Sequence, residues 1–414
     1  MTVMPWVAHG DASADGEDSR ADGDDHRTRR LRIAMIAPPF FELPPTGYGG
    51  IEAMVAGLVD QLTDRGHDVL LIGAGRHRTR ARRFCPVFDR PLSERLGTPL
   101  PEVIHAARAA AVLRDADVDI VHDHTLAGPL LALCRRIPTV VTVHGEADGE
   151  LGSYYAALGD SVDIVAISDA QRSLNPHLNW VGVVHNAIDV ASFPYRERKG
   201  DYVLWLGRFC EEKGAHLAID GARAAGLPIV LAGKCREQAE RAYFEREITR
   251  RLGPGVRYAG EADAAQKRQL LSRARALAFP VQWEEPFGLV MIEAMACGTP
   301  VVALRRGSVP EIVADGITGI IVDNPAALPG ALAAAGQLDP ARCRQHVLDR
   351  FDLPAMAAGY ERLYRMLAEG SRQVNALAAG VATPGPRHAA SARHAALPRR
   401  PVLPKFVSWP AARR

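Results

Sequence analysis

Residues 276–303 read ALAFPVQWEEPFGLVMIEAMACGTPVVA and contain the signals of a strand, a helix and a second strand. The run at 276–279 is short and apolar, as in a buried strand, and the run at 301–303 has the same character. Between them, Pro286 is typical of a helix start and Gly298 of a helix end. Strands that alternate with helices in this way indicate parallel βαβ units.

The same alternation extends from residue 31 to about residue 370. We expect strands at 32–37, 69–72, 119–122, 139–144, 163–167 and 182–185, and again at 202–206, 229–231, 256–258, 276–279, 301–303 and 319–322. Helical segments such as 51–64 lie between them. This pattern predicts an α/β fold with two doubly wound, Rossmann-like domains. Ligands of such sheets bind beyond the carboxyl ends of the strands, so the cleft between the domains is the expected site.

The expected domains are an N-terminal one at 31–190, a C-terminal one at 191–353 and a last helix at 354–370 that crosses back onto the first domain. A polar stretch at 195–200 fits the boundary between the domains. Residues 1–30 carry seven acids and four bases and have no apolar period, which predicts disorder.

The C-terminal segment, residues 371–414, carries eight bases, no acid and six prolines, and we expect it to be mostly disordered. Its basic and apolar residues offer a contact with an anionic membrane. That alternative is the less favoured one, because the prolines prevent an amphipathic helix.

Composition excludes several classes of protein. Apolar residues make up 47% and charged residues 24% of the chain, as in ordinary globular proteins. Residues 31–370 are close to neutral in net charge and lack the excess of basic residues that is typical of proteins that bind nucleic acid. The sequence has no stretch of 18 uncharged apolar residues and no recognisable secretory leader. Its six cysteines show no paired spacing. These features predict a cytoplasmic protein.

The acidic motif that runs from Glu285 to Glu293 is the strongest chemical signal. The expected helix start offers free backbone amides to an anion or a sugar, and these belong to Phe287, Gly288, Leu289 and Val290. Eight helical residues span about 12 Å. Two carboxylates that flank one glycosidic bond stand about 5–9.5 Å apart, so these two are expected to anchor hydroxyls along an elongated ligand. The alternative is a pair of solvated surface glutamates.

Further motifs follow one another in a fixed order. They are Ala37-Pro-Pro-Phe40, Gly47-Tyr-Gly-Gly-Ile-Glu52, Val143-His-Gly145, Asn186-Ala-Ile-Asp189, Leu206-Gly-Arg-Phe-Cys-Glu-Glu-Lys-Gly214, Glu285–Glu293 and Pro310-Glu-Ile-Val313. In this order and spacing they resemble the retaining glycosyltransferases of family 4, which have the GT-B fold. The resemblance covers about residues 31–370. The opening motifs are similar to those of the bacterial branch that contains an avilamycin-type antibiotic glycosyltransferase.

The resemblance implies transfer of a hexose, with retention of configuration, from a nucleotide-diphosphate sugar to a sugar, lipid-linked or small-molecule acceptor. It implies that no cofactor and no metal take part. Arg208 and Lys213 follow the first strand of the second domain, where two cations can stabilise a leaving diphosphate. A pair of surface cations is the alternative.

The resemblance also assigns the remaining site residues. It places His144 and Glu285 at the donor sugar and Glu293 at the ribose. Gly49 and Gly50 are expected near the donor phosphate and the acceptor, because glycine permits a close backbone approach. The structural alternative for His144 is a core histidine whose ring nitrogens are hydrogen-bonded within the protein. The structural alternative for Gly49 and Gly50 is a sharp turn without a ligand.

Other interpretations of the sequence are weaker. A dinucleotide fingerprint needs glycine where Glu52 stands. His122 and His124 share a strand face, but no third metal ligand at a matching spacing is evident. Glu311 is expected to act as a charge at a helix start. The functional rivals are a sugar-nucleotide epimerase on the same fold and a non-catalytic scaffold that binds nucleotide sugars.

Overall fold

The computed structural model describes residues 29–47 and 49–380, with side chains up to residue 370. Disorder was expected for residues 1–30 and 371–414. Residues 1–28 and 381–414 lie outside the described residues, as does Tyr48, whereas residues 371–380 are helical and do not fit that expectation. Contacts between residues group the chain up to Ser371 into one compact unit. All six cysteines lie in the described part, and all are free.

The first half folds into a sheet of seven parallel strands. They are β1 (Arg32–Ile36), β2 (Asp68–Ala74), β3 (Arg83–Phe88), β4 (Ile120–Asp123), β5 (Thr139–Thr142), β6 (Asp163–Ala166) and β7 (Trp180–Val183). Their order in the sheet is β3-β2-β1-β4-β5-β6-β7. The chain therefore winds outward from β1 in one direction and from β4 in the other.

The second half repeats this topology with six parallel strands. They are β8 (Val203–Leu206), β9 (Ile229–Ala232), β10 (Val256–Tyr258), β11 (Ala276–Phe279), β12 (Val301–Leu304) and β13 (Gly319–Val322). The order is β10-β9-β8-β11-β12-β13. The predicted α/β fold with two doubly wound, Rossmann-like halves is confirmed. In each half the winding reverses between two central strands, β1 and β4 or β8 and β11.

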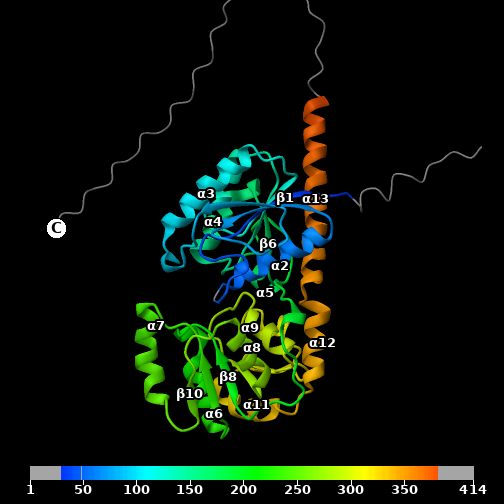
Figure 1. Cartoon of the computed structure of the whole chain (residues 1–414). Helices are drawn as coiled ribbons and strands as arrows, with labels where there is room; N and C mark the ends of the chain where they lie inside the picture. Colours follow the sequence, from blue (N-terminus) through cyan, green and yellow to red (C-terminus); the bar gives the residue numbers. More distant parts are fainter. Residues whose placement is uncertain (1–28, 48, 381–414) are drawn as a thin grey trace, which may run out of the picture. The chain divides into compact units, whose positions relative to one another are not determined.

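Helices connect the strands in both halves, and further helices follow the final strand, β13 (Figure 1). They are α2 (Gly50–Asp64), α3 (Pro99–Arg114), α4 (Gly149–Leu158), α5 (Asp169–Leu174), α6 (Ala215–Ala224), α7 (Gln238–Tyr243), α8 (Ala264–Arg273), α9 (Leu289–Ala296), α10 (Val309–Ile312), α11 (Leu328–Ala335), α12 (Pro340–Arg350) and α13 (Leu353–Gly380). Across residues 29–47 and 49–380, no helix combines the length and the apolarity needed to cross a bilayer.

The apolar run of β1 is continuous because both faces of the strand are covered. Ile33 and Met35 belong to the core that includes α2 and α13, whereas Ala34 and Ile36 face the core on the other side of the sheet. A parallel sheet with helices on both faces buries every residue of a central strand. This burial explains why residues 32–37 lack the alternation of a half-exposed strand.

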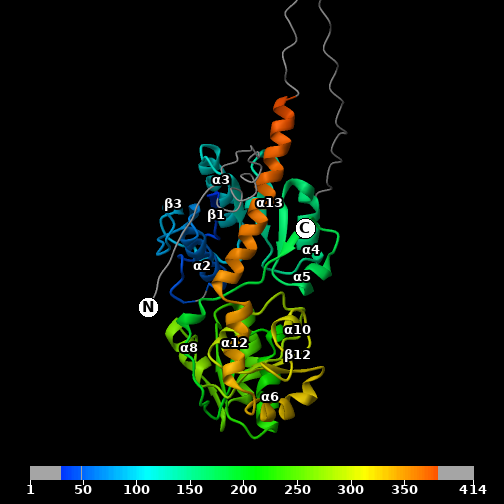
Figure 2. The same cartoon turned by 90° about the vertical axis from the view of Figure 1, so that its right-hand side faces the viewer.

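The last helix packs against the first half of the chain. Met356, Tyr360 and Tyr364 of α13 share a buried core with β1 and α2. A Cβ atom added to Gly57 of α2 would lie 2.6 Å from Leu353, so the two helices are in close contact. Figures 1 and 2 both show α13 beside α2. The helix continues to Gly380, beyond its expected end at residue 370.

One strand was not predicted, and the start of one helix was misplaced. The edge strand β3 was not predicted, because Pro86 interrupts it and most of its residues are only partly buried. The helix α9 begins at Leu289 rather than near Pro286, because Gly288 adopts a left-handed conformation with φ 77° just before it. The residues from Glu285 to Gly288 therefore form a loop and not the first turn of the helix.

Candidate active site

The predicted site residues lie where the winding of each sheet reverses. In the second half, β8 leads into the segment that carries Arg208 and Lys213, and its neighbour β11 leads toward Glu285. In the first half, β1 leads toward the Gly49–Gly50 turn, and the adjacent strands β4 and β5 lead to the histidines. Ligands of doubly wound folds bind at this position, so the topology by itself brings the candidates together.

Lys213 and Glu285 form an ion pair, although they are separated by 72 positions in the chain. Lys213 Nζ also lies 4.7 Å from the centre of the Trp283 ring, and Trp283 Nε1 donates a hydrogen bond to Glu285 Oε2 at 3.0 Å. Glu285 is 7% exposed. The carboxylate is thus held by two donors, and the cation is placed by a carboxylate and an aromatic face.

A glycine turn fixes the position of Lys213. Gly214 has a φ of 67°, and a Cβ atom there would lie 2.1 Å from the carbonyl oxygen of Pro280. Only glycine fits this close approach in the left-handed region. The turn therefore presses the start of α6 against the end of β11 and brings Lys213 to Glu285.

Arg208 is half-buried and lies two residues beyond β8. Within residues 29–47 and 49–370, its guanidinium has no hydrogen-bond or ion-pair partner. A guanidinium carries five donors in a planar fork, which suits the oxygens of a phosphate. Arg208 is therefore a cation of this loop whose guanidinium has no described hydrogen-bond partner, although the charge of Glu237 lies near enough to interact with it.

Glu293 is held by a second lysine. Lys267 Nζ of α8 lies 2.5 Å from Glu293 Oε1, and Glu293 is 8% exposed. The two carboxylates of the acidic motif are thus bound to different cations, Lys213 and Lys267, and do not bond to each other. This arrangement agrees with two separate anchor points.

The N-terminus of α9 presents unpaired backbone amides. None of the described residues accepts a hydrogen bond from the amides of Gly288, Leu289 or Val290. Phe287, in contrast, is 2% exposed and packs in the core, so its side chain is not available to a ligand. Of the four predicted amide donors, Phe287 can act only through its backbone.

The starts of α2 and α9 meet. A Cβ atom added to Gly50 would lie 2.9 Å from Leu289 Cδ1, so the first residues of the two helices are in contact. Gly49 caps α2 with a φ of 138°, a conformation that other residues rarely adopt. The predicted glycine turn and the acidic motif therefore adjoin, with two helix N-termini directed at one region.

His144 lies two residues beyond β5, in a loop that Gln171 of α5 holds. Gln171 Nε2 donates to the carbonyl oxygens of Val143 at 2.9 Å and Gly145 at 2.6 Å. His144 Nε2 lies 2.9 Å from His124 Nδ1. Burial lowers the pKa of His144 to about 4, so its imidazole is neutral at neutral pH.

His122 and His124 contact different side chains. His122 Nδ1 lies 2.6 Å from the Tyr364 hydroxyl, and His122 Nε2 lies 2.7 Å from Thr142 Oγ1. Both ring nitrogens of His122 are therefore engaged by α13 and β5. In the part of the chain that the structure describes, no three His, Cys, Asp or Glu side chains gather as metal ligands.

Glu311 links the two halves of the chain. Its carboxylate accepts hydrogen bonds from the backbone amides of Asp169 and Ala170, at the start of α5, and pairs with His185 Nε2 at 2.5 Å. Burial alone would raise the pKa of Glu311, but these hydrogen bonds lower it below its usual value. Glu311 thus lies in the first turn of its own helix, α10, as expected, and it also binds the start of α5 from the other half of the chain.

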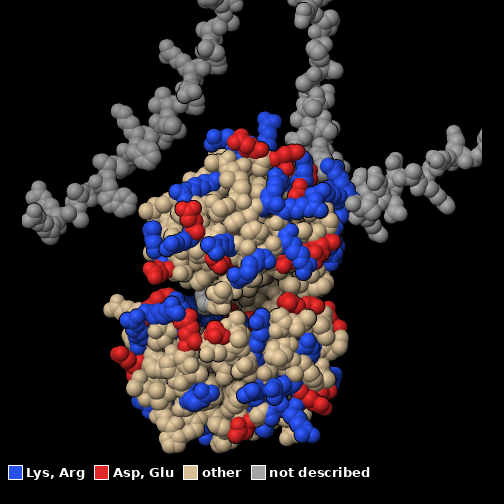
Figure 3. Space-filling model, viewed as in Figure 1, with Lys and Arg blue, Asp and Glu red and all other residues tan. Residues whose placement is uncertain are grey.

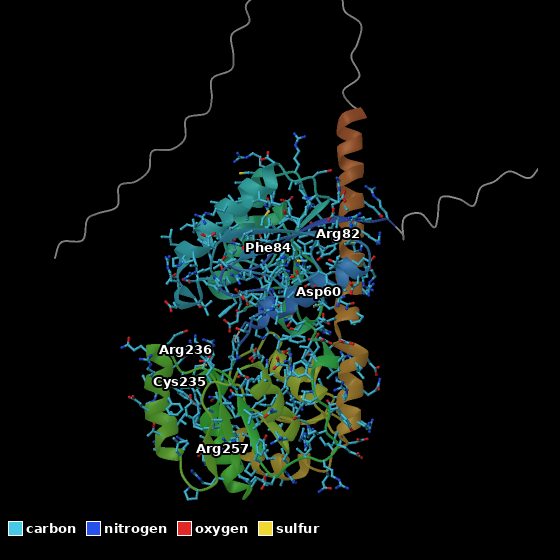
Figure 4. The ribbon with its side chains drawn as sticks, in the orientation of Figure 1. Asp60, Arg82, Phe84, Cys235, Arg236 and Arg257 are labelled. Carbon is cyan, nitrogen blue, oxygen red and sulfur yellow. The ribbon has the colours of Figure 1, made fainter. Side chains whose placement is uncertain are left out.

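A pocket of about 560 Å³ adjoins this region. It is lined by Phe40, Phe41, Glu42, Pro45, Thr46, Gly47, Pro91, Ser93, Glu94, Leu96, Lys234, Arg236, Glu237 and Glu261. Figure 4 labels Arg236 on the segment between β9 and α7. Figure 3 shows cations and anions intermixed over the visible face, and Lys234 and Arg236 pair with Glu237 and Glu261. The pocket is therefore polar, and its lining carries four glutamates against two cations, so its formal charge is negative.

Several members of the site were not predicted from the sequence. Trp283 stands between an expected strand and Glu285, where its aromatic ring was a usable signal. Lys267 contacts Glu293 from 26 positions away, and no local pattern points to it. His124 was considered only as a metal ligand, and its contact with His144, 20 positions away, was not predicted. Only the packing of neighbouring strands and helices brings such residues to the site.

The fold and this site define a GT-B glycosyltransferase. Residues 48–192 match Glycosyltransferase Family 4, and residues 191–336 match Glycosyl transferases group 1. The alpha-maltose-1-phosphate synthase of Mycobacterium tuberculosis is 31% identical over 339 residues, with 70% of this chain and 84% of the relative covered. The chain therefore belongs to the family 4 glycosyltransferases.

Two further likenesses agree with that assignment. The glycogen synthase of Mycobacterium tuberculosis is 27% identical over 415 residues, covering 83% of this chain and 96% of the relative. The crystal structure of a glycosyltransferase involved in avilamycin A biosynthesis is 27% identical, with a TM-score of 0.63. That match covers 82% of this chain and 98% of the solved one. The expected relation to the avilamycin-type branch is thereby supported.

Proposed function

We propose that this protein is a retaining, metal-independent glycosyltransferase that moves a hexose from a nucleotide-diphosphate sugar to an acceptor hydroxyl. The observation that carries this proposal is the Lys213–Glu285 pair, which lies at the strand ends beside the free amides of α9. A cation for the diphosphate and a carboxylate for sugar hydroxyls then stand next to each other, as the two ends of a sugar–phosphate bond require.

The proposed reaction exchanges one bond to the anomeric carbon for another. The acceptor oxygen forms a bond to that carbon on the face from which the diphosphate departs, and the carbon–oxygen bond to the phosphate breaks. The acceptor proton passes to a phosphate oxygen. Arg208 and Lys213 stabilise the charge that develops on the diphosphate, Glu285 and His144 bind sugar hydroxyls, and Glu293 binds the ribose. No nucleophile of the protein takes part in this scheme.

The polar pocket beside the glycine turn supports an acceptor that carries hydroxyl groups. Glu42, Ser93 and Glu94 line it from the first half, and Phe40 adds an apolar wall. Sugars bind in this manner, with polar side chains at the hydroxyls and a ring face at the aliphatic surface. A sugar, a lipid-linked sugar and a small hydroxylated molecule all fit this description.

A panel of nucleotide sugars tests the donor assignment. A ligand at 100 times its dissociation constant stabilises the folded state by about 2.7 kcal/mol, so the true donor is expected to raise the melting temperature. The anomeric configuration of the isolated glycoside then tests retention. Conversion of the nucleotide sugar without any acceptor would favour an epimerase, and binding without any conversion would favour a scaffold.

Activity is expected to survive removal of divalent metals. If Arg208 and Lys213 neutralise the diphosphate, dialysis against a chelator leaves turnover nearly unchanged, because the cations belong to the chain. The measurement is steady-state turnover before and after chelation, with Mg²⁺ and Mn²⁺ added back. Strict dependence on either ion would contradict the assignment of the two side chains.

Substitutions of Glu285 and Glu293 are expected to affect sugar binding and nucleotide binding differently. Glu293→Gln weakens both the nucleotide and the nucleotide sugar, because it is assigned to the ribose. Glu285→Gln weakens only the nucleotide sugar, and it leaves nucleotide affinity equal or higher because Lys213 loses its competing anion. Calorimetric titration with both ligands distinguishes the roles. Glu284→Gln, at an exposed neighbouring position, serves as the control. Equal weakening of both ligands by both variants would refute the division.

A further inference from the structure

Two histidines meet at the ends of neighbouring strands. His124 follows β4 directly and is 4% exposed. Its Nδ1 atom lies 2.9 Å from His144 Nε2, and the two rings lie 29° from parallel. On its other side, His124 Nε2 lies 3.3 Å from the sulfur of Met35, a fully buried residue of β1.

A hydrogen bond between two neutral imidazoles contains one hydrogen. Burial lowers the pKa of both His124 and His144, so neither ring is protonated at neutral pH. Each neutral ring carries one N–H and one bare nitrogen. Either His124 donates from Nδ1 and leaves its Nε2 bare, or His144 donates from Nε2 and leaves its own Nδ1 bare.

The sulfur of Met35 decides between these two arrangements. A thioether has lone pairs and no hydrogen, so it accepts hydrogen bonds and cannot donate one. If His124 Nε2 carried no hydrogen, its lone pair would face the lone pairs of the Met35 sulfur, and this buried nitrogen would have no hydrogen-bond partner. With the hydrogen on His124 Nε2, the sulfur accepts it, and His124 Nδ1 is free to accept from His144.

We propose that Met35 and His124 hold His144 as the Nε2–H tautomer, so that its Nδ1 can only accept a hydrogen bond from a hydroxyl of the transferred sugar. This inference rests on the proposed function, in which His144 faces the donor. Met35 and His124 are positioning residues, since neither touches the sugar. Gln171 anchors the backbone on both sides of His144, so the ring presents the accepting nitrogen from a fixed loop.

Proton–nitrogen correlation spectra of the histidine rings test the tautomer directly. The protein is labelled in its histidines, and the signals of residue 144 are identified by their loss in His144→Gln. We expect one bare and one protonated nitrogen, with the hydrogen on Nε2, at neutral pH and without any ligand. A hydrogen on Nδ1, two averaged nitrogens or a doubly protonated ring would each overturn the proposal.

A conservative substitution tests the role of the sulfur. Met35→Leu keeps the volume of the core but removes the acceptor, so the two arrangements become similar in energy. The chemical shifts of the two ring nitrogens of His144 are then expected to move toward a common average value. Met54→Leu changes another buried methionine of the same core, for which no histidine contact is described, and leaves the spectrum unchanged. Identical spectra for Met35→Leu and the wild type would exclude selection by Met35.

Donor binding connects the tautomer to function. If half of the Met35→Leu molecules carry the wrong tautomer, the dissociation constant of the donor rises about two-fold. UDP-glucose and GDP-mannose are the probes, and Met54→Leu is the control. An unchanged constant in Met35→Leu, together with averaged nitrogens, would refute the sugar contact. If neither probe nor any other nucleotide sugar binds the wild type, the proposed function fails, whereas the spectra without ligand still decide the tautomer.

Discussion

Replacing Lys213 with alanine is expected to lower turnover by about 10²–10³-fold while weakening donor binding much less. Charge on the departing phosphate grows as the sugar bond breaks. A cation aimed at that phosphate stabilises the transition state more than the bound donor, and such an interaction raises the rate constant. Steady-state kinetics over a range of donor concentrations separate the two effects.

The structure adds a stability effect to this prediction. Lys213 is the ionic partner of Glu285, which is 7% exposed. Removing one member of a buried pair leaves the other without compensation, which costs about 3–5 kcal/mol when burial is complete. We therefore expect a lower melting temperature as well, and turnover must be measured well below it.

A substitution of Arg208 separates the loss of turnover from the loss of stability, because no described residue forms an ion pair with its guanidinium. Arg208→Ala is expected to lose turnover similarly but to keep its melting temperature. The double variant should lose less than the sum of the single losses, since both cations act on one group. Arg223→Ala, an exposed position in the last turn of α6, is the control for loss of a cation. Wild-type turnover in folded Lys213→Ala would show that this loop does not hold the leaving diphosphate.

Glu52→Gln is expected to stabilise the protein by about 3 kcal/mol at pH 8 and to have almost no effect near pH 4.5. Glu52 lies in the first turn of α2 and is 4% exposed. Burial raises the pKa of its carboxyl group from 4.5 to about 7, and the charge of Glu102 adds to the shift.

The sign follows from the number of protons that each state binds. Between pH 4.5 and pH 7 the folded state keeps the Glu52 proton, whereas the unfolded state has lost it. The stability of the wild type therefore falls as the pH rises through this window, and the full penalty applies above pH 7. Glutamine carries no charge at any pH, so the variant avoids this penalty.

The measurement is the difference in unfolding free energy between Glu52→Gln and the wild type across this pH range. The difference cancels the pH dependence of all other groups. Glu150→Gln, at an exposed position in the first turn of α4, is the control for replacing a glutamate that is not buried. A constant difference for Glu52→Gln would mean that Glu52 titrates normally in the folded protein.

The strands of the two sheets were predictable because most of them are buried on both faces. Such a strand consists of consecutive apolar residues, as at 276–279 and 301–303, and turn-forming residues bound it. The exceptions lie at the edges. The edge strand β3 is mostly only partly covered and contains Pro86, so its composition resembles that of a loop. The last strand, β7, lies at 180–183 rather than at 182–185, and its pairing with β6 contains a register shift.

The chemistry of the site was predictable where residues close in sequence carry it. Glu285, Gly288 and Glu293 lie in one motif, and the free amides were expected from a helix start near Pro286, whereas the helix begins at Leu289. The side chain of Phe287 was not predictable as a core residue from the motif alone. Whether it faces the core or the ligand depends on which way the loop before α9 turns, and Gly288 decides that direction through its left-handed backbone.

The sequence by itself determined the family, the succession of most strands along the chain and the kinds of charged groups at the strand ends, because these depend on local patterns that repeat along the chain. Only the tertiary structure decided which groups pair. Lys213 meets Glu285 because β8 and β11 are neighbours in the sheet, and His144 meets His124 because β5 and β4 are neighbours. Parallel strands joined by crossovers bring together residues that are distant in sequence, so the partner of each charge depends on the order of the strands and not on spacing along the chain.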